Sequence, residues 1–162
     1  MGKIPITKSG FEKLKKELEY IKTVDLPENM RDMEVARAHG DITENAEFQA
    51  AKDRQNFLKG RIKELENNLS ASYVVNLDGL TCEKVVFGST VTLEDINTGN
   101  GIKYQLVGPF ESDVNENKIS VTSPIGKALI GKCVGDAVSV KTPGGTREFE
   151  VVDISVDAVK LS

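Results

Sequence analysis

Apolar positions recur at alternating spacings of three and four on both sides of a short turn in the first 70 residues. The first stripe contains Phe11, Leu14, Leu18 and Ile21, and the second contains Phe48, Ala51, Gln55, Leu58, Ile62, Leu65 and Leu69. Because this spacing keeps one face of a helix apolar, each half predicts an amphipathic helix. Two such helices joined by a tight turn predict an antiparallel hairpin, with arms of about 45 Å at 1.5 Å per residue.

The first stripe is interrupted between Thr23 and Glu28, where the sequence contains Pro27. A proline inside a helix lacks the N–H for one hydrogen bond and clashes with the preceding turn, at a cost of about 3 kcal/mol. We therefore expect a kink here, with Asp25 capping a fresh helix. The arm should then continue through Arg37 and stop at Gly40.

The turn between the arms carries two carboxylates three residues apart, Asp41 and Glu44. Small residues surround them, among them Ala36, Ala38 and Ala46. A hairpin that narrows to small side chains and presents acid at its tip can reach into a confined space. The same pair also fits a capping box that begins the second helix, and both roles can be held at once.

Basic residues near the turn form a second group. Arg37 and Lys52 lie about equally far from the turn on opposite arms, so they can face the same way, while Arg54, Lys59 and Arg61 lie at or beyond that distance. Two interpretations stay open for this group. It can contact phosphates, which adds affinity without base specificity, or it can be a solvated face paired with nearby acids.

From Tyr73 the periodicity changes from helical to alternating, which predicts strands. The expected strands cover residues 73–75, 84–87, 89–93, 103–107, 118–121, 137–141 and 148–154. One short helix is expected after Ser123 as N-cap, with Ile125, Leu129 and Ile130 directed inward and Gly131 ending it. The sequence therefore predicts an α+β protein with two domains: a coiled-coil hairpin over residues 1–75 and an antiparallel sheet with one helix over residues 76–162.

Composition excludes several classes of function. The net charge of the chain is −4, and residues 1–75 carry 13 basic and 13 acidic side chains, so independent tight binding to duplex nucleic acid is not expected. No apolar run reaches the roughly 18 residues of a membrane span. Cys82 and Cys133 are far apart and are expected to be free thiols in a reducing cytoplasm. His39 is the single histidine and is expected on the surface near the tip, so neither a His-based metal cluster nor a Ser-His-Asp triad is expected.

Five segments in order along the whole chain give it a family resemblance. The chain resembles the bacterial Gre-type transcript cleavage factors, in their GreA branch. The resemblance is carried by the tip HGDITENAEF at 39–48, by Arg61-Ile62, by FGSTV at 87–91, by SPIGKALIGK at 123–132 and by KTPGG at 141–145. It implies a C-terminal domain of FKBP-like fold that docks on RNA polymerase. It further implies that the hairpin enters the secondary channel and stimulates hydrolysis of the 3′ end of a backtracked transcript.

The resemblance also implies roles for particular residues. Asp41 and Glu44 would act at the polymerase active site, where they share a Mg²⁺ ion and activate the attacking water, and Arg37 and Lys52 would contact the extruded 3′ RNA. Hydrolysis by two metals needs both ions held about 3.5–4 Å apart. Mg²⁺ is usually bound by one or two carboxylates together with phosphates and waters. We therefore expect no metal on the isolated chain, which should be a cytoplasmic monomer and not a stand-alone enzyme.

Two other functions are compatible with parts of the sequence. A Gre relative can enter the polymerase and inhibit it without cleavage, but such relatives are expected to have a denser acidic tip than Asp41 and Glu44 alone. FKBP-like domains are often prolyl isomerases, whose sites need an aromatic-lined pocket. The C-terminal part has no Trp and few aromatic residues, which disfavours that activity.

Overall fold

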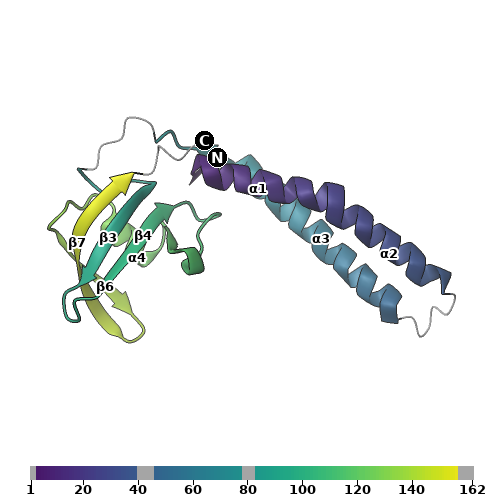
Figure 1. The fold of residues 1–162 in the computed structure, drawn as a ribbon. Coiled ribbons are helices and arrows are strands. Elements are labelled where there is room, and N and C mark those ends of the chain that lie inside the picture. The colour runs from purple at the N-terminus through teal and green to yellow at the C-terminus, as the bar shows by residue number, and fades with distance from the viewer. Residues whose placement is uncertain (1–2, 40–45, 78–82, 157–162) are drawn as a thin grey trace. The chain divides into compact units, whose positions relative to one another are not determined.

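The computed structural model describes residues 3–39, 46–77 and 83–156. The chain divides into two compact units, Phe11–Ala71 and a second unit that joins Met1–Gly10 to Ser72–Ser162. The first unit is helical and the second contains the sheets, so the α+β class is confirmed (Figure 1). The first ten residues group with the sheet because strand β1 (Ile4–Ile6) pairs in parallel with strand β2 (Ser72–Val74), which the helical periodicity does not predict.

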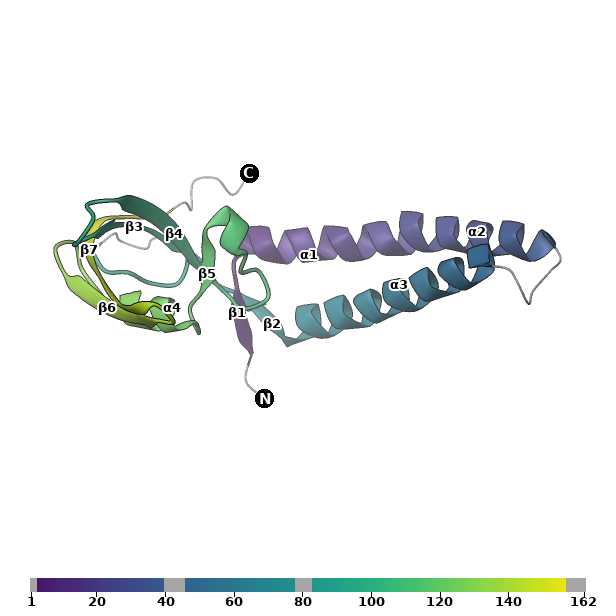
Figure 2. The ribbon, with the colours of Figure 1, turned by 90° about the horizontal axis from the view of Figure 1, so that it is seen from below.

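The hairpin consists of one composite arm and one continuous arm. Helix α1 (Lys8–Tyr20), a π-helical turn η1 (Ile21–Asp25) and helix α2 (Leu26–Ala38) follow one another, and helix α3 (Ala46–Ala71) runs beside them (Figures 1 and 2). The predicted stripes lie between the arms: Leu14, Ile21, Leu58 and Leu65 are buried, and the remaining members are half-buried. The hydrophobic pattern therefore identified the contact face of both arms.

The first arm stays helical where a fresh helix start was expected. Asp25 has helical dihedral angles (φ −64°, ψ −47°) and its side chain makes no capping hydrogen bond, so the predicted cap is wrong. Instead the N–H of Leu26 donates to the carbonyl of Ile21, five residues back. This π-helical turn contains one residue more than a turn of α-helix. Pro27, which has no N–H to donate, follows it in the first turn of α2.

The second unit is built on a five-stranded sheet with the order β5-β4-β3-β7-β6. Its strands are β3 (Ser89–Asp95), β4 (Gly101–Val107), β5 (Lys118–Ser120), β6 (Ala137–Thr142) and β7 (Gly145–Val156). All neighbours are antiparallel except β4 and β5, which are parallel, so the expectation of a fully antiparallel sheet is wrong at this edge. The chain reverses twice between them, through the loop after Val107 and a 3₁₀ turn (Val114–Glu116), and therefore enters β5 in the direction of β4.

The strand predicted over residues 84–87 does not form. Val85 is fully buried, which explains the apolar run, but its backbone makes only one pair of hydrogen bonds outside its own segment. The N–H of Val85 donates to the carbonyl of Lys132 at 2.8 Å, and its carbonyl accepts from Gly131 at 2.8 Å. A single pair of bonds anchors the segment in the core without extending into a ladder.

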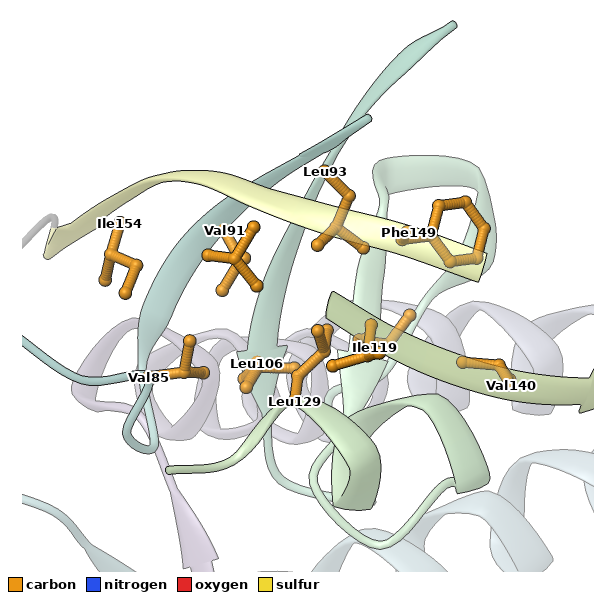
Figure 3. Packing of buried hydrophobic residues seen from close by; sticks show 11 residues of the cluster. Val85, Val91, Leu93, Leu106, Ile119, Leu129, Val140, Phe149 and Ile154 are labelled. Carbon is orange, nitrogen blue, oxygen red and sulfur yellow. The ribbon is translucent and has the colours of Figure 1, made fainter. Parts of the chain in front are cut away.

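The core of this unit lies between the curled sheet and helix α4 (Pro124–Leu129). Figure 3 shows Leu129 directed from α4 towards Leu106 and Ile119 at the sheet. The helix begins as predicted, because the hydroxyl of Ser123 accepts from the N–H of Gly126 at 3.1 Å. Ile130 was expected to point inward, but it is 40% exposed, since the helix has already ended at Leu129.

One carboxylate joins the start of α1 to the loop after β4. Oε2 of Glu111 accepts from the N–H groups of Thr7 (2.8 Å) and Gly108 (2.9 Å), and Oε1 accepts from the hydroxyl of Thr7. The same hydroxyl caps α1 by accepting from the N–H of Gly10 at 3.0 Å. Thr7 is 3% exposed, so these groups have little access to water if Glu111 is lost.

We expect Glu111→Ala to lower the free energy of unfolding by about 1–3 kcal/mol, because it leaves buried donors of Thr7 without an acceptor. Urea unfolding of the full chain measures the change. The matched control is Glu150→Ala, an exposed acid on β7, which should change the same quantity by less than about 0.5 kcal/mol. Equal effects of the two substitutions would contradict the role given to Glu111.

A second carboxylate organises the turn between β3 and β4. Oδ2 of Asp95 accepts from Nη2 of Arg147 at 2.7 Å, and Oδ1 accepts from the N–H groups of Asn97 and Thr98 at 2.8 and 3.1 Å. The hydrogen bond from Arg147, aided by the two backbone bonds, lowers the pKa of Asp95 against the opposing effect of burial. The ionised form is therefore favoured in the folded state.

Because the pKa of Asp95 is lower in the folded than in the unfolded chain, its stabilising effect is present above the unfolded value of about 3.9 and is lost as the pH falls through the folded value. We expect wild type to lose more stability than Asp95→Asn between about pH 6 and pH 3. Urea unfolding of both proteins across this range measures the difference. Parallel curves for the two proteins would contradict the assignment.

Candidate functional site

The predicted site falls where the two arms of the hairpin meet. Asp41 and Glu44, with Gly40 and Thr43, lie outside the described residues. The catalytic and metal-binding roles of Asp41 and Glu44 therefore stay predictions. The structure does describe the residues on either side, which begin and end the connection between α2 and α3.

Two contacts join the arms next to this connection. Cζ of Arg37, in the last turn of α2, lies 5.5 Å from the centre of the Phe48 ring in the first turn of α3. Nδ1 of His39 lies 3.5 Å from Oε2 of Glu47, and both side chains are well exposed. Both contacts cross from α2 to α3, so the arms stay together up to the last described residues at the tip.

Arg37 and Lys52 are both exposed, as a nucleic-acid contact requires. Arg37 is also oriented, because a guanidinium over an aromatic ring is held by the charge distribution of that ring. Arg54 and Lys59 are exposed on α3 as well. The contact of Arg37 and Lys52 with RNA stays a prediction.

Arg61 has a different role from the other basic residues. Its Nε and Nη2 donate to the two carboxylate oxygens of Glu17 on α1 at 2.7 and 2.9 Å, and its Nη1 donates to Glu64. The hydrogen bond to Glu17 raises the pKa of Arg61 against the effect of partial burial. Lys22 pairs with Glu66 in a further link between the arms, at 2.9 Å. Arg61 therefore links the two arms of the hairpin. For this residue, pairing with nearby acids is favoured over contact with phosphates.

A groove of about 440 Å³ lies between α2 and α3. Its lining comprises Asn29, Asp32, Val35, Ala36, Glu47, Ala50, Ala51 and Arg54. Asn29 is 1% exposed, and its Nδ2 donates to the carbonyl of Ala51 on the opposite arm at 2.8 Å. The hydrophobic pattern does not identify Asn29, because its side chain is polar, although it lies one heptad before the buried Ala36.

The described residues offer no other candidate for a metal centre. Within ranges 3–39, 46–77 and 83–156, no cluster of three or more His, Cys, Asp or Glu side chains is arranged to hold an ion. Cys133 is a free thiol, as expected, while Cys82 lies outside the described residues. No helix in the described part of the chain is both long and apolar enough to cross a membrane.

Comparison with known proteins gives the same family along the whole chain. Residues 4–74 match the model for the N-terminal domain of transcription elongation factors, and residues 80–156 match the model for the C-terminal domain of the GreA and GreB factors. Together these matches cover both units of the fold. The chain belongs to the GreA/GreB family of transcription elongation factors.

Two relatives named transcription elongation factor GreA agree with this assignment. The chain is 62% identical over 161 residues to transcription elongation factor GreA of Syntrophus aciditrophicus, covering 99% of this chain and 100% of that protein. It is 49% identical to GreA of Pelobacter propionicus over 95% of this chain and 98% of that protein. A solved structure of the transcription factor Gfh1 is 36% identical over 95% of this chain and 99% of that chain, with a TM-score of 0.46.

We expect Phe48→Leu to lower the free energy of unfolding of the hairpin by about 0.5–1 kcal/mol, because leucine keeps the apolar contact but removes the ring that holds Arg37. Urea unfolding measures the change. Phe57→Leu is the matched control, since Phe57 is on the same helix and 66% exposed. In an Arg37→Met background the effect of Phe48→Leu should disappear, and its persistence there would contradict the contact.

Proposed function

We propose that this chain binds bacterial RNA polymerase, inserts its hairpin into the secondary channel and stimulates Mg²⁺-dependent cleavage of the 3′ end of backtracked RNA. The observation that carries the proposal is a hairpin whose arms are joined up to the turn that contains Asp41 and Glu44, in a chain of the GreA/GreB family. Cleavage of the displaced end returns a new 3′ end to the active site and rescues the arrested complex.

The tip is proposed to supply metal ligands. It does not form a complete active site by itself. Two-metal hydrolysis of a phosphodiester requires a second ion and a positioned water. Asp41 and Glu44, delivered together, provide carboxylate oxygens that can bind Mg²⁺ directly or through water and can orient or deprotonate the nucleophile. The hydrolysis itself belongs to the polymerase, which holds the metal and the RNA, so the isolated chain is not an enzyme.

Arg37 and Lys52 are proposed to hold the extruded 3′ segment of the RNA. Both are exposed, and Arg37 is held over the ring of Phe48, where its donors can still reach a phosphate. Contacts of this kind bind any sequence, which suits a factor that acts wherever the polymerase stops. We further propose that the chain is cytoplasmic and acts as a monomer. A monomer is expected because the hairpin has to enter a narrow channel.

The test uses purified bacterial RNA polymerase halted in a backtracked complex with 3′-labelled RNA and Mg²⁺. Wild type should release short 3′ fragments. Asp41→Ala and Glu44→Ala should each reduce the rate by about 10²-fold or more, because they remove a ligand or a proton acceptor from the transition state. Asp53→Ala, an exposed acid on α3, is the matched control and should keep the wild-type rate.

Competition for the polymerase separates chemistry from binding. Asp41→Ala and Glu44→Ala should each compete for the polymerase with the same affinity as the wild-type protein. If wild type blocks elongation and releases no fragment, the chain is a channel-binding inhibitor and the roles proposed for Asp41 and Glu44 are wrong. If the tip variants cleave at the wild-type rate, capping of α3 is their whole role.

A further inference from the structure

The buried residues of the first arm have an irregular spacing. From Leu14 onwards they are Leu14, Ile21, Asn29 and Ala36, at intervals of seven, eight and seven. In a continuous α-helix eight residues turn about 800°, which is about 80° past two full turns. Asn29 would then lie off the contact face. The π-helical turn at Ile21–Asp25 takes up the additional residue and returns Asn29 to that face.

The half of the hairpin nearest the tip has little apolar packing to hold its arms in register. In α2 the buried residues are Asn29 and Ala36, and in α3 they are Leu58, at the middle of the helix, and Leu65, towards the other end. The facing positions near the tip are Phe48, whose ring lies beside Arg37, and the small Ala51, and a groove lined in part by Ala50 and Ala51 remains between the arms there. Small side chains of this kind do not interlock, so they set the offset of one helix against the other only weakly.

Asn29 supplies a contact that depends on register. Its Nδ2 donates to the carbonyl of Ala51 at 2.8 Å across the arms, and a shift of one helical turn would move that carbonyl by about 5.4 Å. Among the described residues of the hairpin unit, Asn29 is the one polar side chain that is fully buried, and its Oδ1 has no hydrogen-bond partner. A buried oxygen without a partner destabilises the folded state, so an apolar residue would be more stable here.

We propose that Asn29 is a positioning residue that fixes the register of α2 against α3 and thereby aims the tip. This inference rests on the function proposed above. A polar residue in a helical seam specifies one alignment at a cost in stability, because only that alignment satisfies its hydrogen bond. The π-helical turn places Asn29 in the seam, and the bond to Ala51 then fixes where Arg37 and His39 are held.

The test compares Asn29→Leu with Gln55→Leu. Gln55 is a half-buried amide in the seam of α3, so both substitutions replace an amide by the same apolar side chain. Spin labels at Glu34→Cys and Asp53→Cys, two exposed positions on opposite arms, report the register in proteins with Cys82→Ser and Cys133→Ser. Asn29→Leu should broaden the distribution of label distances without lowering the melting temperature, and Gln55→Leu should change neither.

Cleavage of backtracked RNA provides the second readout. At saturating factor, Asn29→Leu should reduce the rate by about 10-fold or more, since small misplacements of reacting groups are costly. The factor concentration for half-maximal rate should stay unchanged. Gln55→Leu should match wild type in both quantities.

Several results would overturn the proposal. An unchanged distance distribution in Asn29→Leu, or a broadened one with wild-type cleavage, shows that Asn29 does not position the tip. A lowered melting temperature shows that Asn29 stabilises the hairpin and does not trade stability for register. If wild-type protein itself releases no RNA fragment, the proposed cleavage function fails, and the spin-label distances alone still decide whether Asn29 sets the register.

Discussion

Burial of apolar side chains between two helical arms is the constraint on which the hairpin depends. A two-helix arm has no second layer, so its contact face is a narrow stripe, and the large buried residues on it are Leu14, Ile21, Leu58 and Leu65. Leu14, Ile21 and Leu65 lie in the half of the hairpin away from the tip, and Leu58 lies at the middle of α3. Polar links between the arms, such as the bidentate pair of Arg61 with Glu17, reinforce that half. Pairs of this kind at exposed positions contribute only about 0–1 kcal/mol, and the half-buried, bidentate pair of Arg61 with Glu17 has the more favourable geometry.

In the half of the hairpin nearest the tip, the arms are held together by different contacts. A slender probe requires small side chains, and small side chains bury little area and interlock poorly. Polar and aromatic contacts take over the task of alignment there: Asn29 with Ala51, Arg37 with Phe48, and His39 with Glu47. Each of these contacts contributes little to the free energy of unfolding, but each requires a particular distance and orientation. In this half of the hairpin the described contacts therefore define the position of the arms more than they stabilise them.

The sheet unit has a conventional core, and its loops are fixed by carboxylates that accept several hydrogen bonds at once. Asp95 holds the turn between β3 and β4, and Glu111 holds the start of α1. In both cases one acid satisfies backbone N–H groups that strands and helices leave without partners. Loops held in this way keep a fixed shape.

The sequence by itself determined the helical hairpin, its contact face and six of the seven predicted strands, because periodicity depends on near neighbours along the chain. Five motifs in order along the chain indicated the family. Only the tertiary structure decided the parallel pairing of β5, the loop conformation at Val85 and the pairing of β1 with β2, since these depend on partners distant in sequence. The candidate site divides in the same way. Acids and bases at the tip are visible in the sequence, whereas the role of Asn29 appears only once the π-helical turn places it opposite Ala51.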